Sequence, residues 1–286
     1  MQGLDKGIGH HQPKATAVSD ERFLVGVLRA LGGGLIFGLP MLMTQEMWSL
    51  GFTISPLRLG LLVILHLPLL VLLAAHIGFE KATGWSACLR DAVVAYGLGI
   101  VSSALILVVF GVISDEMPIS EIVNKIAIQA VAASLGALLA RSQLGGSPAE
   151  PKGRGALAYP SELFLMAVGA LFLCLNVAPT EEVVVISYKM TEWHALVLIA
   201  MSILAMHAFV FTVGFHGQED ATPDAAWGSD FVRFTVVGYV LACLVSLYVL
   251  WTFGQLANDS LPHILMMISV LGFPAAVGAA AARLIL

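Results

Sequence analysis

The sequence predicts an all-α integral membrane protein with eight transmembrane helices, arranged as two parallel four-helix repeats about a pseudo-twofold axis along the membrane normal. Three observations lead to this fold class: the composition, the length of the apolar runs and an internal duplication. Hydrophobic residues make up 58% of the 286 residues and charged residues only 12%, about half of the charged fraction of a soluble domain. Most of the surface is therefore expected to face lipid.

The apolar residues fall into runs of roughly 20, each long enough to cross a bilayer as a helix. We expect helices because lipid offers no partner to backbone polar groups, and because the chain lacks the alternating strands of about 10 residues that form a transmembrane barrel. The eight predicted spans are Phe23–Glu46, Leu57–Phe79, Asp91–Ile113, Ser120–Arg141, Ser161–Glu182, Glu192–Phe215, Phe231–Gly254 and Pro262–Leu284.

Landmarks of the first half return in the same order in the second half, which indicates a duplication. Because each half contains an even number of spans, both halves run in the same direction across the membrane. The matched segments are Pro40 with Pro179, Thr44–Glu46 with Thr180–Glu182, Gly78-Phe79 with Gly214-Phe215, Val93–Tyr96 with Val236–Tyr239, Phe110-Gly111 with Phe253-Gly254, Pro118 with Pro262, and Gly136–Arg141 with Gly278–Arg283.

The segments outside the spans divide the chain into four parts. Residues 1–20 are polar and lack the apolar core of a signal peptide, so they are expected to form a disordered cytoplasmic tail. Residues 21–141 form the first repeat and residues 160–286 the second. Residues 142–159 are rich in glycine and proline and are expected to form a cytoplasmic linker.

Lysine and arginine predict the orientation, because basic residues gather in cytoplasmic loops. With the N-terminus in the cytoplasm, ten basic residues lie on the cytoplasmic side and three on the outer side. Both termini are therefore predicted to be cytoplasmic. The outer loops carry eight acidic residues against those three basic ones. Either this excess has a function, or it is the default result of loops that are poor in basic residues.

Acidic residues that follow a proline at the ends of the first and fifth spans are the main candidate site. Glu46 and Glu182 are predicted to lie at the outer C-terminal end of a helix, where the helix dipole disfavours an acid, with Glu181 beside them. Pro40 and Pro179 are expected to kink the two helices. A ring of carboxylate groups concentrates cations at a pore mouth, although solvated residues at the membrane interface would also explain the pattern.

Five other polar residues in or near the spans are candidates. Thr44 and Thr180 are expected either to cap the interrupted backbone or to help ligate a cation. His66 and His207, near the middle of two spans, either sense protons or pack as neutral residues. Arg29 is an intramembrane charge that either faces protein or water, or extends to the cytoplasmic headgroups.

Several function classes have no support in the sequence. The chain contains no HExxH, GxSxG or phosphate-binding loop, so no catalytic residues, metal site or cofactor are predicted, and an enzyme is not expected. The net charge of −5 and the lack of a basic patch argue against nucleic-acid binding.

The stretch Leu39-Pro40 followed by Thr44-Gln45-Glu46-Met47-Trp48 resembles a family of bacterial integral membrane proteins that is defined only as a domain of unknown function. The resemblance covers most of the chain after residue 20 and includes the eight-span layout. It implies an inner-membrane location and a gene often paired with a second small gene. It implies no activity, cofactor or site residue.

These observations favour a transport protein, with an inorganic cation as the solute and the lipid bilayer as its surroundings. The path is expected between the two halves or at a homodimer axis, with Glu46 and Glu182 at the outer mouth. The alternative is a non-transporting assembly or sensor subunit that docks a small membrane partner protein through the linker or the acidic loop after His216. A third hypothesis is an intramembrane enzyme acting on lipid near Arg29.

Overall fold

The computed structural model describes residues 20–77, 84–144, 159–178, 180–212, 231–257 and 259–285, and within these ranges it contains helices and turns but no strand. The predicted tail up to residue 19, residues 145–158 of the predicted linker, the acidic loop after His216 and Pro179 lie outside the described residues. The side chains of a few residues at helix ends are likewise not described.

The prediction of eight membrane spans is confirmed, since eight helices within the described residues are long and apolar enough to cross a membrane. One span begins with a short π-helical turn, η1, that continues directly as α10. The elements that form the spans are α1 (Asp20–Leu42), α3 (Pro56–Ile77), α4 (Trp85–Val109), α5 (Ile119–Leu144), α6 (Tyr159–Val177), α8 (Glu192–Thr212), η1 (Phe231–Val236) with α10 (Val237–Thr252), and α11 (Leu261–Ile285).

Two short helices were not predicted: α2 (Gln45–Thr53) and α7 (Glu181–Lys189). The predicted first and fifth spans ran past the true helix ends, to Glu46 and Glu182, and at this point the prediction is wrong. The backbone has an extended conformation at Thr44 and at Thr180, and a new helix begins at the residue after each of them. The third span also starts earlier than predicted, at Trp85 instead of Asp91.

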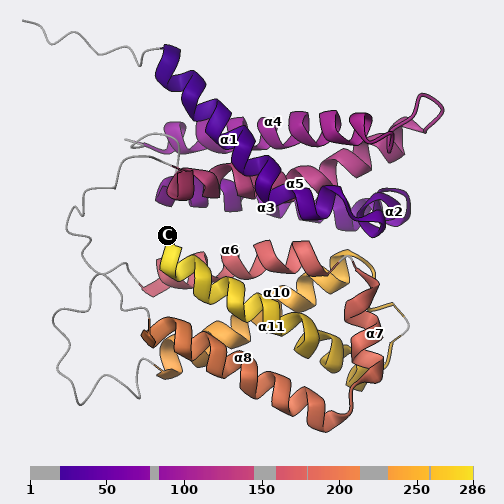
Figure 1. Ribbon diagram of the computed structural model, residues 1–286, viewed down its shortest axis with the longest axis vertical. Helices are drawn as coiled ribbons and strands as arrows, with labels where there is room; N and C mark the ends of the chain where they lie inside the picture. The colour runs from indigo at the N-terminus through magenta and orange to yellow at the C-terminus, as the bar shows by residue number, and fades with distance from the viewer. Residues whose placement is uncertain are drawn as a thin grey trace, which may run out of the picture.

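The helices of each half gather around the last helix of that half (Figure 1). In the first half α5 contacts α1, α2, α3 and α4, and in the second half α11 contacts α6, α7, α8 and α10. The short helices α2 and α7 lie at the same end of the molecule, opposite the end where α1 begins and α11 finishes. We call these the short-helix end and the terminal end.

Glycine allows the first span of each half to approach the central helix closely. A Cβ atom on Gly33 of α1 would lie 2.8 Å from the Gly136 carbonyl of α5, and one on Gly169 of α6 would lie 2.2 Å from the Gly278 carbonyl of α11. Small residues at such crossings let helices in a membrane pack backbone to backbone, where lipid removes the hydrophobic drive that operates in water. These two contacts therefore anchor the first span of each half to its central helix.

The turns that end α4 and α10 have the same backbone geometry. Gly111 has a φ of 69° and Gly254 a φ of 81°, in the left-handed region that favours glycine. In the first turn the Val112 amide bonds to the Leu107 carbonyl at 2.9 Å, and at the matching place in the second the Gln255 amide bonds to the carbonyl five residues back, Leu250, at 3.0 Å. Both helices thus end in the six-residue hydrogen bond typical of a glycine C-cap.

Packed side chains join the two halves. The Phe37 ring of α1 meets the Phe172 ring of α6 edge to face, with centroids 5.4 Å apart. Near the short-helix end the guanidinium group of Arg58 lies over the Trp251 ring, 5.3 Å from its centroid. Aromatic and cation–π contacts of this kind stabilise the interface between the halves at these two points.

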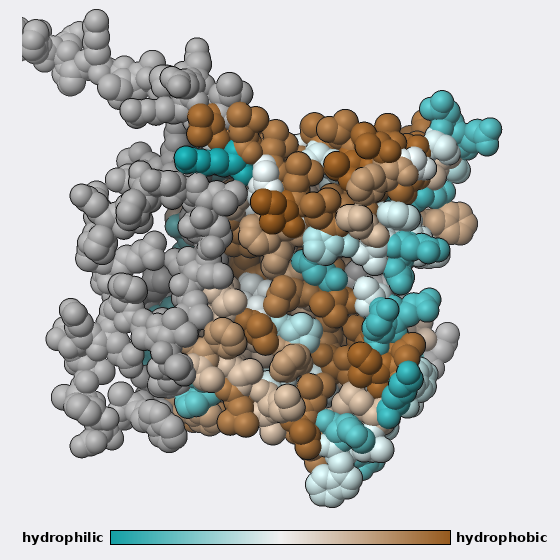
Figure 2. Space-filling view, in the orientation of Figure 1, coloured by the Kyte–Doolittle hydropathy of each residue, from teal (hydrophilic) through white to brown (hydrophobic). Residues whose placement is uncertain are grey.

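The outer surface of the bundle carries the side chains expected to face lipid. Large apolar residues are widely exposed along α3, α4, α8 and α10, and Figure 2 shows the hydrophobic colour over most of the described face. Hydrophilic residues gather at the edge of that view where α2 and α7 lie. This distribution fits a multi-pass integral membrane protein whose short helices lie near the membrane–water interface.

We expect Gly169→Ala to destabilise the protein by about 1–3 kcal/mol, because the added methyl group meets the Gly278 backbone, which cannot rotate away. Gly60→Ala is the matched control, since a Cβ there has no atom within 4 Å, and it should leave stability unchanged or slightly raised. Unfolding by SDS titration of the purified protein measures both. Equal stability of the two variants would contradict the close contact between α6 and α11.

Candidate functional site

The acidic residues singled out in the sequence lie at the beginning of helices. Glu46 lies in the first turn of α2, and Glu181 and Glu182 lie in the first turn of α7. The prediction that Glu46 and Glu182 end the preceding helix is therefore wrong. The partial positive charge at a helix N-terminus favours a carboxylate group. The positions of these acids are therefore explained by the stability of α2 and α7, whereas the predicted positions at a C-terminal end would have been unfavourable.

The threonines before these acids repair the backbone where the spans end. The Thr44 hydroxyl donates a hydrogen bond to the Pro40 carbonyl, and the Thr180 hydroxyl donates one to the Val177 carbonyl at 2.8 Å. Pro40 lies inside α1, two residues before its end, whereas Pro179 lies outside the described residues. Of the two expected threonine roles, these bonds correspond to the backbone cap.

Side chains from neighbouring helices and turns donate hydrogen bonds to the carbonyl groups at the ends of these spans. Trp48 Nε1 donates to the Leu42 carbonyl at 2.8 Å, and Gln129 Nε2 of α5 donates to the Met41 carbonyl at 3.4 Å. In the second half Gln255 Nε2 donates, at 2.5 Å, to the carbonyl one residue beyond the end of α6. The ends of α1 and α6 thus receive the hydrogen bonds that a helix cannot supply to its own last carbonyl groups.

The two acidic elements lie on separate parts of the short-helix end. Glu46 is half-buried, whereas Glu181 and Glu182 are exposed. Helix α2 packs against α5, and α7 packs against α11, so each acid is held by its own half. None of the three lines either of the two cavities described below.

His66 is buried on α3 and bonded to the central helix of its half. Its Nε2 lies 2.7 Å from Ser134 Oγ of α5, and that hydroxyl donates its own proton to the Val131 carbonyl at 2.9 Å. The histidine must therefore donate from Nε2. Its Nδ1 is left as a buried acceptor with no described protein partner. The Tyr96 ring lies beside it, with centroids 5.9 Å apart.

His207 and Arg29 have different surroundings from those of His66. His207 is half-buried, with Nδ1 3.2 Å from Thr235 Oγ1 of η1 and its ring against Phe231. The two histidines thus bond to different kinds of neighbour, His66 to a central helix and His207 to a π-helical turn. Arg29 is exposed on the surface of α1, which corresponds to the expected extension toward the headgroups.

An ion pair between a buried lysine and a half-buried glutamate at the short-helix end was missed in the sequence. Lys125 of α5 is buried, and its Nζ lies 2.7 Å from Glu121 Oε1 and 3.5 Å from Met117 Sδ. Gly51 of α2 makes room for it, since a Cβ there would lie 2.2 Å from Lys125 Cγ. The spacing of Glu121 and Lys125, four residues apart within a predicted span, was a usable signal.

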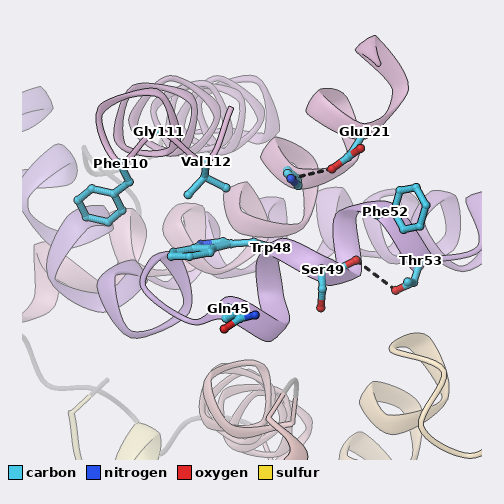
Figure 3. A pocket seen from close by; sticks show the side chains of 10 residues that line it. Gln45, Trp48, Ser49, Phe52, Thr53, Phe110, Gly111, Val112 and Glu121 are labelled. Atoms are coloured by element: carbon cyan, nitrogen blue, oxygen red, sulfur yellow. Dashed lines mark hydrogen bonds and ion pairs between the residues drawn. The ribbon is translucent and has the colours of Figure 1, made fainter. Parts of the chain in front are cut away.

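This ion pair lines an open cavity of about 420 Å³ between α2, the turn after α4 and the start of α5. Figure 3 shows Trp48 and Ser49 of α2 on one side, Phe110 and Val112 on another, and Glu121 beyond them. We call it the α2–α5 cavity. A second, apolar cavity of about 320 Å³ lies on α10, and its lining includes Leu247.

A polar cluster joins α7 to α11 in the second half. His263 Nε2 lies 3.1 Å from Ser187 Oγ and 4.0 Å from Asp259 Oδ1, and its ring stacks on Tyr188 at 3.8 Å. The Tyr188 hydroxyl donates to Asp259 at 3.0 Å, which raises the pKa of this tyrosine. In a hydrolase triad the serine and the aspartate contact different nitrogens of the histidine ring. Here both approach Nε2, so this is not a triad, and the contacts instead hold α7 against the start of α11.

Comparison with known proteins agrees with this architecture. The family model described as "Putative integral membrane protein (DUF2391)" matches residues 26–286. The chain belongs to this family. A search of the curated proteins and a search of the solved structures found no match. The family assignment confirms the resemblance seen in the sequence and the membrane location, and its description states no activity.

The start of α7 gives a titration that can be checked. The Thr180 hydroxyl, when it donates to the carboxylate group in place of the Val177 carbonyl, and then the backbone amide of Glu182 itself, lower the pKa of Glu182 from the ordinary 4.5. The charge contributes to helix stability above pH 4.5, and this contribution is lost as pH falls through the lowered pKa. We expect Thr180→Val to raise the Glu182 pKa, measured by carboxyl ¹³C NMR. Thr53→Val, on α2, should not change it. An unchanged pKa in Thr180→Val would contradict the hydrogen bond.

Proposed function

We propose that the protein transports a cation or a proton, along a path inside the first half of the molecule. The described residues include three buried side chains of aspartate, histidine or lysine, namely His66, Asp91 and Lys125, and all three lie in this half. Ionisable groups are costly inside a membrane and mark ion or proton pathways more often than packing sites. The buried polar residues of the second half are serines and threonines.

The buried groups of the first half lie at successive depths. Lys125 lies near the short-helix end of α5, and Asp91 lies near the terminal end of α4, with its carboxylate 3.5 Å from the Arg90 guanidinium. His66 lies between them, on α3. Its unpartnered Nδ1 is the observation that carries the proposal, because a buried acceptor without a protein partner is suited to a water molecule or a transferred proton.

The acids of the short helices have a supporting role in this proposal. Glu46, Glu181 and Glu182 add negative charge to the short-helix end, and such a field raises the local concentration of cations. Cation binding by these residues, with Thr44 and Thr180, is part of the proposal. His207 is assigned a secondary role in proton sensing, since it is half-buried and bonded to a hydroxyl group.

We further infer that the halves are two parallel four-helix repeats related by a pseudo-twofold axis along the membrane normal. The order of long and short helices is the same in both, the last helix is central in both, and the turns at Gly111 and Gly254 share their geometry. The positive-inside rule supports an orientation with both termini cytoplasmic, so the short-helix end would face outward, and the resemblance to a bacterial family supports the inner membrane as the location.

Proton flux into proteoliposomes tests the transport proposal. We expect a measurable proton flux when a pH gradient and a membrane potential are imposed. His66→Gln should reduce this flux by at least about tenfold, equivalent to about 1.4 kcal/mol on the barrier. His194→Gln is the control, because His194 is exposed at the start of α8, and it should leave the flux unchanged. Absence of flux in the wild type under an imposed pH gradient and potential would refute the proposal.

The packed seam between the halves favours a second candidate, a non-transporting subunit that docks a small membrane protein. The Phe37–Phe172 and Arg58–Trp251 contacts join the halves directly, whereas the cavity on α10, lined by Leu247 and its neighbours, opens at the surface. This candidate requires a partner that co-purifies in a fixed ratio and dissociates when Leu247→Trp fills the cavity, together with an absence of flux in the liposome assay.

A further inference from the structure

The α2–α5 cavity combines charged and aromatic groups at the depth where headgroups meet the membrane. Its polar lining comes from Glu121 and Lys125 together with Gln45, Ser49 and Thr53 of α2. Its apolar lining comes from Trp48, Phe52, Phe110 and Val112. A cavity of about 420 Å³ falls within the usual 300–1,000 Å³ range of small-molecule sites, and it is large enough for a headgroup.

The charge of the cavity selects the kind of ligand. Lys125 and Glu121 form an ion pair at 2.7 Å, so the site has no net charge but presents one donor group and one acceptor group side by side. A ligand with a single charge would leave one member of the pair uncompensated. A zwitterion supplies an anionic oxygen to Lys125 and a cationic N–H group to Glu121, and charge-assisted hydrogen bonds of both kinds are strong.

The surroundings of the cavity indicate that the ligand arrives from the membrane. Phe52 is 75% exposed and Phe110 is 42% exposed at its edge, and neighbouring Ile119 at the start of α5 is 79% exposed. Such side chains would be unfavourable around the mouth of a site for a water-soluble ligand, but they are suited to acyl chains and to the glycerol region. Aromatic residues are typical of this depth in the membrane.

We propose that the α2–α5 cavity binds the headgroup of phosphatidylethanolamine, a zwitterionic phospholipid with a primary amine. The phosphate accepts a hydrogen bond from Lys125 Nζ, and the ammonium group donates to the Glu121 carboxylate. The Trp48 ring, which lines the cavity (Figure 3), also offers its face to the ammonium group. The site shares Lys125 with the proposed transport path, but its test requires neither flux nor the His66 region.

Native mass spectrometry of the delipidated protein tests the site, with synthetic phospholipids of identical acyl chains. We expect phosphatidylethanolamine to bind about tenfold more tightly than phosphatidylglycerol or phosphatidylcholine, the change that follows from losing one charge-assisted hydrogen bond. Successive N-methylation of the amine should weaken binding stepwise, because each methyl group removes an N–H donor. Soluble phosphoethanolamine at high concentration should compete weakly, because it carries both charged groups that the cavity is proposed to bind.

Two variants locate the binding in this cavity. Glu121→Gln removes the charge that receives the amine, and Ser49→Trp fills the cavity from an exposed position while leaving both residues of the ion pair in the sequence. Both should abolish the preference for phosphatidylethanolamine. Glu192→Gln and Thr191→Trp are the matched controls, because both residues are exposed at the start of α8, outside the cavity lining, and they should retain the preference. Equal binding of the three lipids, or a preference that survives both Glu121→Gln and Ser49→Trp, would overturn the proposal.

Discussion

The structure depends on satisfying the last carbonyl groups of the first span in each half. In lipid, no water is available to form a hydrogen bond with an unpaired carbonyl group. Helices α1 and α6 each end only a few residues before the next short helix begins. The protein meets this requirement with the hydroxyl groups of Thr44 and Thr180 and the amide groups of Gln129 and Gln255. Because these bonds fix where each span ends, they also set the position of α2 and α7, and with them the acids and the α2–α5 cavity.

The same constraint connects the acids to the rest of the site. Glu46 and Glu182 lie at helix N-termini, so their negative charges stabilise the short helices. The same charges contribute to the negative electrostatic field at the short-helix end. Helix α2 in turn covers the buried Lys125 through Gly51. A proposed site for headgroups and a proposed entrance for cations thus share one scaffold, in which the position of the short helix decides what Lys125 and Glu121 can contact.

Composition and length were enough to predict eight spans, because the requirement for roughly 20 apolar residues is a property of the bilayer. They did not predict α2 and α7, since a nine-residue amphipathic helix after a span continues the apolar pattern, and only the threonine N-cap marks the break. The pairing of His66 with Ser134 depends on which faces of α3 and α5 meet, 68 residues apart, and no pattern along a single helix contains that information. The buried state of Lys125 depends on Gly51 in the same way.

The central place of α5 and α11 has a consequence for biogenesis. Each is the last helix of its half to leave the ribosome, yet each contacts all the other helices of that half. Until α5 is inserted, α1 lacks the partner that receives Gly33, and the earlier spans have no finished core to pack against. We therefore expect the three earlier spans of each half to remain loosely packed in the membrane until the final helix is inserted between them.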